Sequence, residues 1–528
     1  MDRWRALPPD AAAEREALVD TIQAQAAQLD LVPAAPGWNG SGPQEVEQLR
    51  GRLAEIEQSL IPTGLHVVGQ PPSDDERRDL LELVAEAGAP PEERVRVERC
   101  LRDDPEIPAL LHALDGGFVS PVPGGDLLRT PAIVPTGRNI YGFDPFRMPT
   151  PFAVADGRRQ ADALLARHVA THGSLPETVA IVLWGTDNMK SEGAPLAQAL
   201  ALLGARPRID YLGRLTGAEL VPLAELGRPR IDVLVTLSGI FRDLLPLQVK
   251  LLAEAALLAA SADEPLEQNL VRAHALAHMS ALGCDLETAA LRVFSNAEGA
   301  YGSNVNHLVD SGTWQDDGEL AETFVRRKGF AYGAGGRAVA QPRLFERAIA
   351  GASCAYQNLD SVEYGVTDLD HYYDSLGAIA KVAETRGASV RVYVGDQTRG
   401  THLVRTIDEQ VALESRTRLL NPRWYEGMLK HGYEGVRLIE TQVSNTFGWS
   451  ATTDAVPGWV YTRTTETFVL DAEMRARLAA LNPHAVVKLS HRLLEAHDRG
   501  FWQPDEDTLA ALRDASADLE DRLEGVLT

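Results

Sequence analysis

The stretch NPRWYEGMLKHGYEG, residues 421–435, brings three aromatic rings, two carboxylates and an imidazole close together in the sequence. Rings of this kind stack on a flat ligand, while the oxygen and nitrogen atoms beside them bind a cation or carry a proton. The residues concerned are Trp424, Tyr425, Glu426, His431, Tyr433 and Glu434. An aromatic element of an ordinary hydrophobic core has a similar composition. The stretch therefore indicates either the wall of a ligand site or a core element.

A second stretch, SVEYGVTDLDHYYDS at 361–375, combines carboxylates, tyrosines and a histidine. Carboxylates this close together raise one another's pKa or gather a hard divalent cation, which prefers oxygen ligands. The main candidates are Glu363, His371 and Asp374. The alternative is the solvated acidic start of a helix, although an exposed helix start does not need the tyrosines.

Polar residues also follow two apolar runs that are typical of buried strands. The run TVAIVLW (178–184) is followed by Asp187 and Lys190, and the run IDVLVTLSG (231–239) is followed by Arg242. In open α/β sheets, ligands bind at the edge formed by the carboxyl ends of the strands. We therefore expect these three side chains to share a crevice, with turn and helix-capping chemistry as the alternative.

The segment VFSNAEGAYGSNVN (293–306) is too polar for a core strand and too rich in glycine for a stable helix. We expect it to line a ligand, and a surface loop is the alternative. His274 and His278 lie four residues apart in HALAH but lack the glutamate of a metal-binding HExxH motif, so they indicate an ordinary packed helix. The chain has no Gly-Lys dipeptide and hence no Walker A motif, so it should not hydrolyse ATP through a P-loop of its own.

A chain of 528 residues exceeds the size at which one hydrophobic core stops growing, so we expect several domains. Apolar strands that alternate with helices predict an α/β fold built on a doubly wound parallel sheet, and a further strand is expected at 389–396. The predicted regions are a helical segment at 1–115, a Gly/Pro-rich ordered loop at 116–150, the doubly wound domain at 151–262, a mixed helical and α/β region with the candidate active-site loops at 263–400, and a helical C-terminal region at 401–528.

The composition excludes several classes of function. A formal net charge of −24 argues against nucleic-acid binding, because a phosphate backbone is bound by Lys and Arg. The three cysteines form no CxxC pair, so neither a disulfide framework nor a zinc knuckle is expected. No apolar run approaches the roughly 18 residues of a membrane-spanning helix, and the N-terminus lacks the apolar region of a signal peptide. We expect a cytoplasmic protein without a transmembrane segment.

Taken together, these segments resemble the large, porphyrin-binding subunit of magnesium chelatase, a relative of the large subunit of cobaltochelatase. The resemblance runs from about 116 to 455, through stretches that include GGDLLRTPAIVPTGRNIYGFDPFRMPT, VLWGTDNMKSEG, VFSNAEGAYGSNVNHLVDSGTW, DHYYDSLG and LNPRWYEGMLKHGYEG. The segments WGTDN and FSNAEGAYGSN favour the bacteriochlorophyll type over the cobalt type. The chain resembles the C-terminal part of the family's large subunit, which is more than twice as long.

The resemblance implies insertion of Mg²⁺ into protoporphyrin IX in (bacterio)chlorophyll biosynthesis, driven by ATP hydrolysis on separate AAA+ partner subunits. It also implies an upstream polypeptide that completes the large subunit. In that function, Asp374 and Glu363 deliver Mg²⁺ or accept protons and His371 relays protons. A second group of metal candidates is Glu426, His431 and Glu434. Contacts with the porphyrin are expected from Trp424, Tyr425, Tyr433 and Asn304, and with its propionates from Arg129 and Arg138.

Three other interpretations stay open. In the first, the chain is a cobaltochelatase-type large subunit that acts on a corrin precursor. In the second, it is a truncated, non-catalytic module that binds porphyrin or docks to the motor subunits. An unrelated sugar- or nucleotide-binding α/β protein is supported only by the doubly wound segment.

Overall fold

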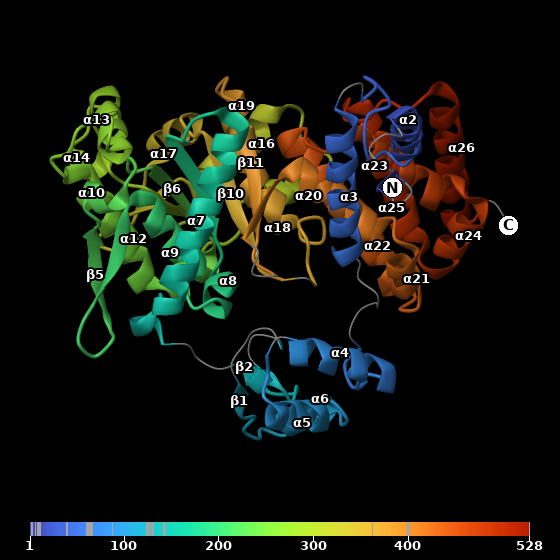
Figure 1. The fold of residues 1–528 in the computed structure, drawn as a ribbon, viewed down its shortest axis with the longest axis horizontal. Coiled ribbons are helices and arrows are strands. Elements are labelled where there is room, and N and C mark those ends of the chain that lie inside the picture. The colour runs from blue at the N-terminus through green and yellow to red at the C-terminus, as the bar shows by residue number, and fades with distance from the viewer. Residues whose placement is uncertain are drawn as a thin grey trace. The chain divides into compact units, whose positions relative to one another are not determined.

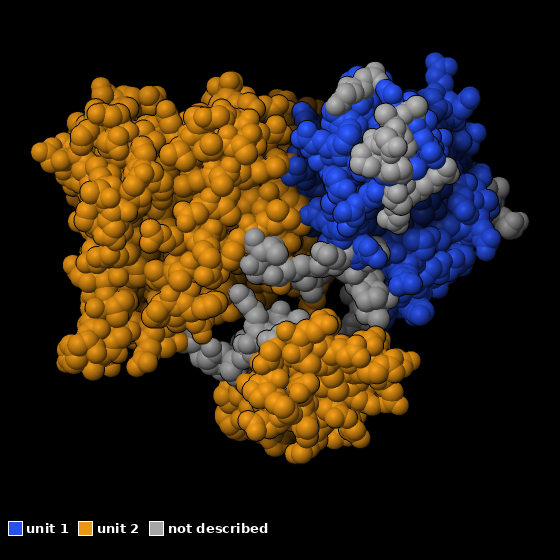
Figure 2. All heavy atoms as spheres, viewed as in Figure 1, with its two compact units in different colours: residues 1–65, 408–450, 454–528 blue, residues 66–407, 451–453 orange. Residues whose placement is uncertain are grey.

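The computed structural model describes residues 1, 4–5, 7, 12–38, 41–59, 67–86, 88–122, 127, 131–140, 144–361, 363–398 and 402–526. The chain divides into two compact units, which Figure 2 distinguishes by colour. The helical unit comprises residues 1–65, 408–450 and 454–528, and the sheet unit comprises residues 66–407 and 451–453.

An eight-stranded sheet with the order β12–β11–β10–β3–β6–β7–β8–β9 forms the centre of the sheet unit (Figure 1). Its strands are β3 (Thr178–Leu183), β6 (Asp232–Leu237), β7 (Val293–Ser295), β8 (Phe330–Tyr332), β9 (Ala338–Ala340), β10 (Cys354–Leu359), β11 (Arg391–Asp396) and β12 (Leu403–Thr406). The five strands β11, β10, β3, β6 and β7 are parallel, whereas β12, β8 and β9 pair antiparallel at the two sides. The predicted α/β fold class is therefore confirmed.

Helices cover both faces of this sheet. One face packs on α7 (Pro151–His172), α9 (Ala194–Leu203), α12 (Pro246–Ser261) and α13 (Leu270–Leu282). The other face packs on α16 (Asp317–Lys328), α17 (Pro342–Ala350) and α19 (Ala378–Thr385). On this second face, the rings of Phe294 and Phe345 stack with their centroids 4.6 Å apart. Every residue of β3 and β6 is buried, which explains why their sequences are mostly apolar.

Shorter elements connect the strands and the long helices. They are α8 (Gly185–Lys190), the antiparallel hairpin of β4 (Ala205–Ile209) and β5 (Leu215–Leu220), α10 (Leu223–Leu226), α11 (Gly239–Leu244), α14 (Leu286–Ala289), α15 (Val305–Ser311), α18 (Asp370–Tyr372) and the π-helical turn η3 (Tyr373–Gly377). Several of them follow directly on the carboxyl ends of the parallel strands.

Residues 66–150 contribute a small helical part of the sheet unit. Its elements are α4 (Asp74–Glu86), α5 (Pro91–Cys100), α6 (Glu106–Leu114), the short parallel pair β1 (Pro121–Val122) and β2 (Asn139–Ile140), and the 3-10 turns η1 (Pro131–Ile133) and η2 (Pro145–Arg147). Ser73 and Glu76 form a capping box at the start of α4: the Glu76 carboxylate accepts from Ser73 N at 2.9 Å, and Ser73 Oγ accepts from Glu76 N at 3.4 Å.

The helical unit joins the two ends of the chain. Its elements are α2 (Ala12–Gln28), α3 (Gly42–Ser59), α20 (Ile407–Glu414), α21 (Pro422–Leu429), α22 (Tyr433–Thr453), α23 (Gly458–Thr465), α24 (Ala472–Leu481), α25 (Pro483–Asp498), α26 (Glu506–Leu523) and the π-helical turns η4 (Ser415–Leu419) and η5 (Glu466–Leu470). Arg416 Nη2 donates to the carbonyl of Asp30 at 2.7 Å, and Arg463 pairs with the Asp30 carboxylate at 3.2 Å. The chain around Asp30 therefore packs with the C-terminal helices.

The structure confirms the predicted strands at 178–184, 231–239 and 389–396, which correspond to β3, β6 and β11. One expectation was wrong: residues 293–295 of the polar segment are the buried strand β7, because Val293 and Phe294 pack on opposite faces of the sheet. The strand β10 and the β4–β5 hairpin were not predicted. The domain boundaries proposed at 115, 150, 262 and 400 stay predictions. Among the described residues, no helix has the length and apolar character needed to cross a bilayer.

The packing of α7 on α9 depends on Gly157. A Cβ atom at this position would lie 2.5 Å from Gln198 N and 2.6 Å from Ala194 O, both backbone atoms of α9. We expect Gly157→Ala to lower the free energy of unfolding by about 1–3 kcal/mol, because the two helices must separate. Urea unfolding followed by circular dichroism measures the change.

The matched control is Gly51→Ala in α3, where a Cβ atom meets nothing within 4 Å. Alanine is the better helix former, so this control should be neutral or slightly stabilising. An unchanged unfolding midpoint in Gly157→Ala would mean that the α7–α9 contact adapts without cost.

Candidate functional site

The order of the parallel strands reverses between β3 and β10. From β3 the chain moves through β6 to β7 on one side of the sheet, and it later returns to β10 and β11 on the other side. Ligands of doubly wound proteins bind at such a switch point, outside the carboxyl ends of the strands. Here β3 ends at Leu183 and β10 at Leu359, so residues 184–190 and the residues after 359 meet at this place.

Asp187, Lys190 and Asp360 form a charged group at the switch point. The Lys190 ammonium lies 3.1 Å from the Asp360 carboxylate, and both side chains are partly exposed. Asp187 is buried, with 4% of its surface exposed. Burial and the neighbouring Asp360 carboxylate raise the pKa of Asp187 to about 7, although Lys190 and a hydrogen bond from Thr186 act in the opposite direction. Asp187 can therefore hold or release a proton near neutral pH.

Two aromatic rings lie at the same edge. The centroids of Trp184, directly after β3, and Tyr372, in α18, are 4.5 Å apart with a tilt of 46° between the rings. This contact brings the DHYYDS stretch against the WGTDN stretch, although the two are far apart in the sequence. The carboxyl edge thus combines the ionisable side chains of Asp187, Lys190 and Asp360 with the rings of Trp184 and Tyr372.

Arg242, in α11, fixes the loop that follows β7. Its Nη1 donates to the carbonyls of Ala297 at 2.8 Å and Ala300 at 2.9 Å, and its Nε and Nη2 donate to Asp243 at 2.6 and 2.9 Å. Tyr301 completes the arrangement, because its hydroxyl donates to Asp243 and its ring lies 5.3 Å from the guanidinium carbon. Arg242 lies at the predicted edge of the sheet, and its hydrogen bonds go to Asp243 and to the loop that follows β7.

The ends of β3 and β6 are tied together by Ser238. Its hydroxyl oxygen accepts from Gly185 N at 3.2 Å and from Phe241 N at 3.1 Å, so it caps α11 and contacts the start of α8 at once. Asp187 and Arg242 therefore stand on adjacent short helices at one edge of the sheet, and the crevice that they were expected to share stays a prediction.

Asp374, in the π-helical turn η3, is buried and closes a network of hydrogen bonds. Its carboxylate accepts from Ser303 N at 3.1 Å, Ser303 Oγ at 2.6 Å and Asn306 N at 3.0 Å. These donors stand at the start of α15, where a carboxylate compensates the exposed N–H groups. Asp374 thereby connects the 293–306 segment with the 361–375 stretch.

Lys328 lies near Asp374 in the interior of the unit. Its ammonium donates to the carbonyl of Leu237, the last residue of β6, at 3.0 Å. Burial lowers the pKa of Lys328 to about 8, while the Asp374 carboxylate partly restores it. This lysine at the carboxyl edge was missed in the sequence, because it falls in the basic run RRK at the end of an amphipathic helix.

The other candidates of the 361–375 stretch lie at the surface. Glu363 is exposed, and its backbone N–H donates to Ser361 Oγ at 3.1 Å. His371 is 64% exposed, with Nδ1 3.5 Å from the Asp370 carboxylate, which also accepts from Asn306 Nδ2 at 2.5 Å. Glu363, His371 and Asp374 thus differ strongly in exposure although they are close in sequence.

The 421–435 stretch belongs to the helical unit, and its residues are spread over α21, α22 and the turn between them. Trp424 is buried in the core, Tyr425 contacts Phe468 edge-on at 5.5 Å, and Tyr433 is 58% exposed. Its two carboxylates are engaged in surface ion pairs, Glu426 with Arg477 at 2.7 Å and Glu434 with Arg437.

These ion pairs have a clear electrostatic effect. Hydrogen bonds from Arg477 and Arg437 lower the pKa of Glu426 and of Glu434, respectively. His431 is half-buried in the turn after α21. The stretch therefore supplies one core ring and one exposed ring, and its carboxylates point to neighbouring arginines.

The remaining residues that were predicted to contact the porphyrin come from different segments of the chain. Asn304 is half-buried and adopts a left-handed backbone conformation with φ 66° before α15, which asparagine tolerates. Arg138 is exposed, and its Nη2 donates to the carbonyl of Pro121 at 2.9 Å. Arg129 lies outside the described residues.

The two histidines of HALAH lie in α13, as expected for a packed helix. His274 Nδ1 is 3.0 Å from the Asp232 carboxylate, which also accepts from Arg292 Nε at 2.8 Å at the amino ends of the strands. Burial lowers the pKa of His278 to about 4. Across the described ranges, no three His, Cys, Asp or Glu side chains are grouped in a way that could hold a metal ion.

The chain matches the family model described as CobN/Magnesium Chelatase over residues 1–99 and 91–509. It is 57% identical over 530 residues to the H subunit of magnesium chelatase from Cereibacter sphaeroides and 46% identical over 430 residues to the chloroplastic magnesium-chelatase subunit ChlH of Oryza sativa subsp. indica. It is 36% identical over 410 residues to the aerobic cobaltochelatase subunit CobN of a Sinorhizobium species. These alignments cover 100%, 80% and 76% of this chain and 43%, 31% and 32% of the relatives.

A solved structure, the catalytic subunit of cobaltochelatase from Mycobacterium tuberculosis, has a TM-score of 0.82 and 30% sequence identity, covering 96% of this chain and 51% of that one. The strand order, with a reversal between β3 and β10 and helices on both faces, defines a doubly wound α/β protein. The chain belongs to the CobN/magnesium chelatase family. It spans less than half the length of the curated relatives.

The buried carboxyl group of Asp187 predicts a pH dependence of stability. Because folding raises its pKa from about 4 to about 7, the folded chain binds more protons than the unfolded chain between these two pH values, and stability falls as the pH rises through this range. Asp187→Asn removes this loss. We expect the variant to gain about 2 kcal/mol in unfolding free energy, relative to the wild type, between about pH 5 and pH 8.

Urea unfolding at the two pH values measures the difference. The exposed Asp162→Asn controls for the loss of one negative charge. An equal effect of both substitutions at both pH values would contradict the assignment of a buried, protonated Asp187.

Proposed function

We propose that this chain is part of the porphyrin-binding subunit of a cytoplasmic magnesium chelatase, which inserts Mg²⁺ into protoporphyrin IX for (bacterio)chlorophyll biosynthesis. The observation that carries the proposal is the 57% identity over the whole chain to an H subunit of magnesium chelatase, against 36% to a cobaltochelatase subunit. AAA+ partner subunits hydrolyse the ATP, in keeping with a chain that has no Gly-Lys of a P-loop. An upstream polypeptide supplies the rest of the large subunit.

Metal insertion requires a base, because the two pyrrole N–H groups of the porphyrin lose their protons as Mg²⁺ enters. A base is most effective when its pKa lies near the working pH. Asp187 meets this condition, since its pKa is raised to about 7. Asp187 takes a pyrrole proton in this proposal. The Lys190 ammonium favours the ionised form of Asp187, whereas the Asp360 carboxylate helps to keep its pKa high.

Trp184, which is partly exposed and rests on the buried ring of Tyr372, provides a wall for the macrocycle beside Asp187. Asp374 acts as a positioning residue, because its carboxylate holds Ser303 and Asn306 and thereby sets the segment that contains Asn304. Glu363 and His371, which are exposed, replace part of the water shell of the incoming Mg²⁺ and carry protons away.

The helical unit, taken by itself, carries a second group of candidate contacts. Tyr433, with its exposed ring, stacks on the porphyrin, while Trp424 is buried and Tyr425 packs on Phe468 inside the helical unit. Glu426, His431 and Glu434 stay the metal candidates of this unit, and Mg²⁺ would compete there with the ion pairs of Glu426 with Arg477 and of Glu434 with Arg437. Arg138 and Arg129 pair with the propionates.

Cobalt is the second candidate metal, because the structural match is to a cobaltochelatase catalytic subunit. The chain is combined with a complementing N-terminal polypeptide, motor subunits and ATP, and is offered Mg²⁺ with protoporphyrin IX or Co²⁺ with a corrin precursor. Turnover of magnesium alone supports the proposal. Turnover of cobalt alone overturns it, and porphyrin quenching without any insertion assigns a binding module.

The proton-acceptor role predicts the behaviour of Asp187→Asn in the assembled magnesium chelatase. Loss of a positioned base lowers kcat by about 10²–10⁴-fold, while the porphyrin dissociation constant stays the same. Stopped-flow measurement of insertion and fluorescence quenching by deuteroporphyrin separate the two quantities.

The control is again Asp162→Asn, which should insert Mg²⁺ like the wild type. A variant Asp187→Asn that retains the wild-type rate removes Asp187 from the mechanism, and a variant with weakened porphyrin binding assigns it to substrate binding.

A further inference from the structure

The helix α6 and the residues just after it present large apolar side chains to solvent. These side chains are exposed to different degrees, from 41% at Ile107 to 81% at Phe118. Residues three, four and seven positions apart lie on one side of a helix, so the helical members of the group form a continuous stripe. The group, called the α6 stripe below, consists of Ile107, Leu110, Leu111, Leu114 and Phe118.

The opposite side of α6 carries small or polar residues and faces its own part of the chain. Glu106 and Ala109 are half-buried there, and the Glu106 carboxylate accepts from Gly69 N at 3.0 Å. The hydrophobic core of this part is formed by Val84, Val97, Leu101 and Val134. A helix normally turns its apolar stripe toward the core. In α6 this orientation is reversed, and none of its residues is buried.

This reversed orientation leaves α6 without the packing that stabilises a short helix. A helix of nine residues is marginal by itself in water and depends on contacts made by its apolar face. A continuous apolar surface that a soluble protein leaves exposed marks a site of interaction with another molecule. The α6 stripe is therefore expected to be covered by a partner.

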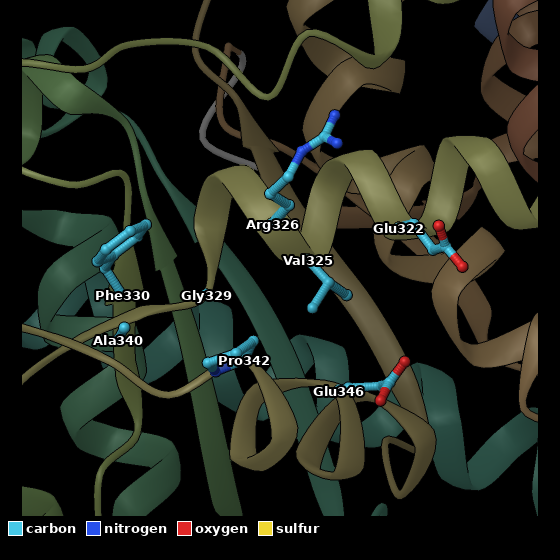
Figure 3. A pocket seen from close by; sticks show the side chains of 8 residues that line it. All are labelled: Glu322, Val325, Arg326, Gly329, Phe330, Ala340, Pro342 and Glu346. Carbon is cyan, nitrogen blue, oxygen red and sulfur yellow. The ribbon is translucent and has the colours of Figure 1, made fainter.

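A groove of about 290 Å³ between α16, α17 and the β8–β9 ladder also has apolar side chains at the surface (Figure 3). Its charged residues are balanced within the chain, because Glu346 pairs with Arg386 and Arg326 lines the same groove as Glu322. This groove therefore indicates no particular occupant. The α6 stripe differs from it, since the stripe is wholly apolar and lies on a helix that has no buried residue.

The relatives of this chain indicate what covers the stripe. The alignment with the H subunit from Cereibacter sphaeroides covers 100% of this chain but 43% of that relative, and the solved cobaltochelatase subunit is covered to 51%. The helix α6 lies within residues 91–509, which match the family model. In these relatives, the part that matches this chain is thus accompanied by a comparable length of further polypeptide.

We propose that the α6 stripe binds the polypeptide that completes the large subunit, through an apolar surface of that polypeptide. The inference rests on the proposed function only for the existence of such a polypeptide. Porphyrin, metal and nucleotide take no part in the contact, so the contact can be measured without them.

The probe is the part of the Cereibacter sphaeroides H subunit that lies outside its alignment with this chain, produced as a separate polypeptide. Biolayer interferometry measures its binding to the full chain without porphyrin, Mg²⁺ or ATP. The double variant Leu110→Gln/Leu114→Gln should weaken binding by about tenfold or more, because two leucines lose their burial in an apolar contact. Glutamine is a good helix former, so α6 itself is kept.

The matched control is the double variant Leu29→Gln/Leu266→Gln, which makes the same change at two exposed leucines outside α6. It should bind the probe like the wild type. Equal losses in the two double variants, unchanged binding of Leu110→Gln/Leu114→Gln, or no binding of the probe to the wild type would each overturn the proposal.

Two measurements on the chain alone test the other possible occupants. Urea unfolding of Leu110→Gln/Leu114→Gln should match the wild type, because substitutions at exposed positions change stability little. A clearly lower midpoint would mean that this chain covers the stripe itself. Light scattering should show a monomer, and a wild-type dimer that this variant dissociates would assign the stripe to a second copy. Either result overturns the proposal.

Hydrogen exchange of the wild type localises the contact without any substitution. The amides of α6 should exchange rapidly in the chain alone and become protected when the probe is added. Binding without protection of α6 overturns the proposal. Magnesium insertion without this protection would keep the proposed function and remove the contact, whereas protection without insertion would keep the contact and remove the function.

Discussion

The parallel pairing of β3 with both β6 and β10 is the constraint on which the candidate site depends. It aligns the carboxyl ends of three strands, so the residues that follow them meet at one edge. Because helices cover both faces of the sheet, this edge is one of the few places where polar side chains can gather without filling the core. Asp187 is partly withdrawn from water there, and the carboxylate of Asp360 lies near it.

Sequence patterns identified β3 and β6 because both are mostly apolar runs of the length of a strand, and the crevice expected between Asp187 and Arg242 stays a prediction. They missed β10, because Gln357 and Asn358 interrupt its pattern although both are buried. Without β10, the switch point and the role of Asp360 could not be inferred. They also missed β7, whose three residues are followed directly by the polar segment. Whether a strand is buried depends on the strands and helices packed around it, and the local sequence carries no information about them.

The same limit applies to clusters of chemical groups. The 421–435 stretch groups carboxylates and rings in the sequence, but the helices α21 and α22 direct Glu426 to Arg477, Glu434 to Arg437 and Trp424 into the core. Conversely, Trp184 and Tyr372 are distant in sequence and adjacent in space. Closeness in the sequence therefore did not predict which side chains lie close together in space, because tertiary packing decides which side chains meet.

The π-helical turn η3 has an evolutionary consequence. A π turn holds one residue more than an α-helical turn, so deleting a single residue between Tyr373 and Gly377 would restore a regular helix. Each residue of an α-helix rotates the chain by roughly 100° about the helix axis. The deletion would therefore turn either Asp374 away from Ser303, or Ile379 and Val382 out of the core. The length of this segment should therefore be fixed among related chains, even where its residues vary.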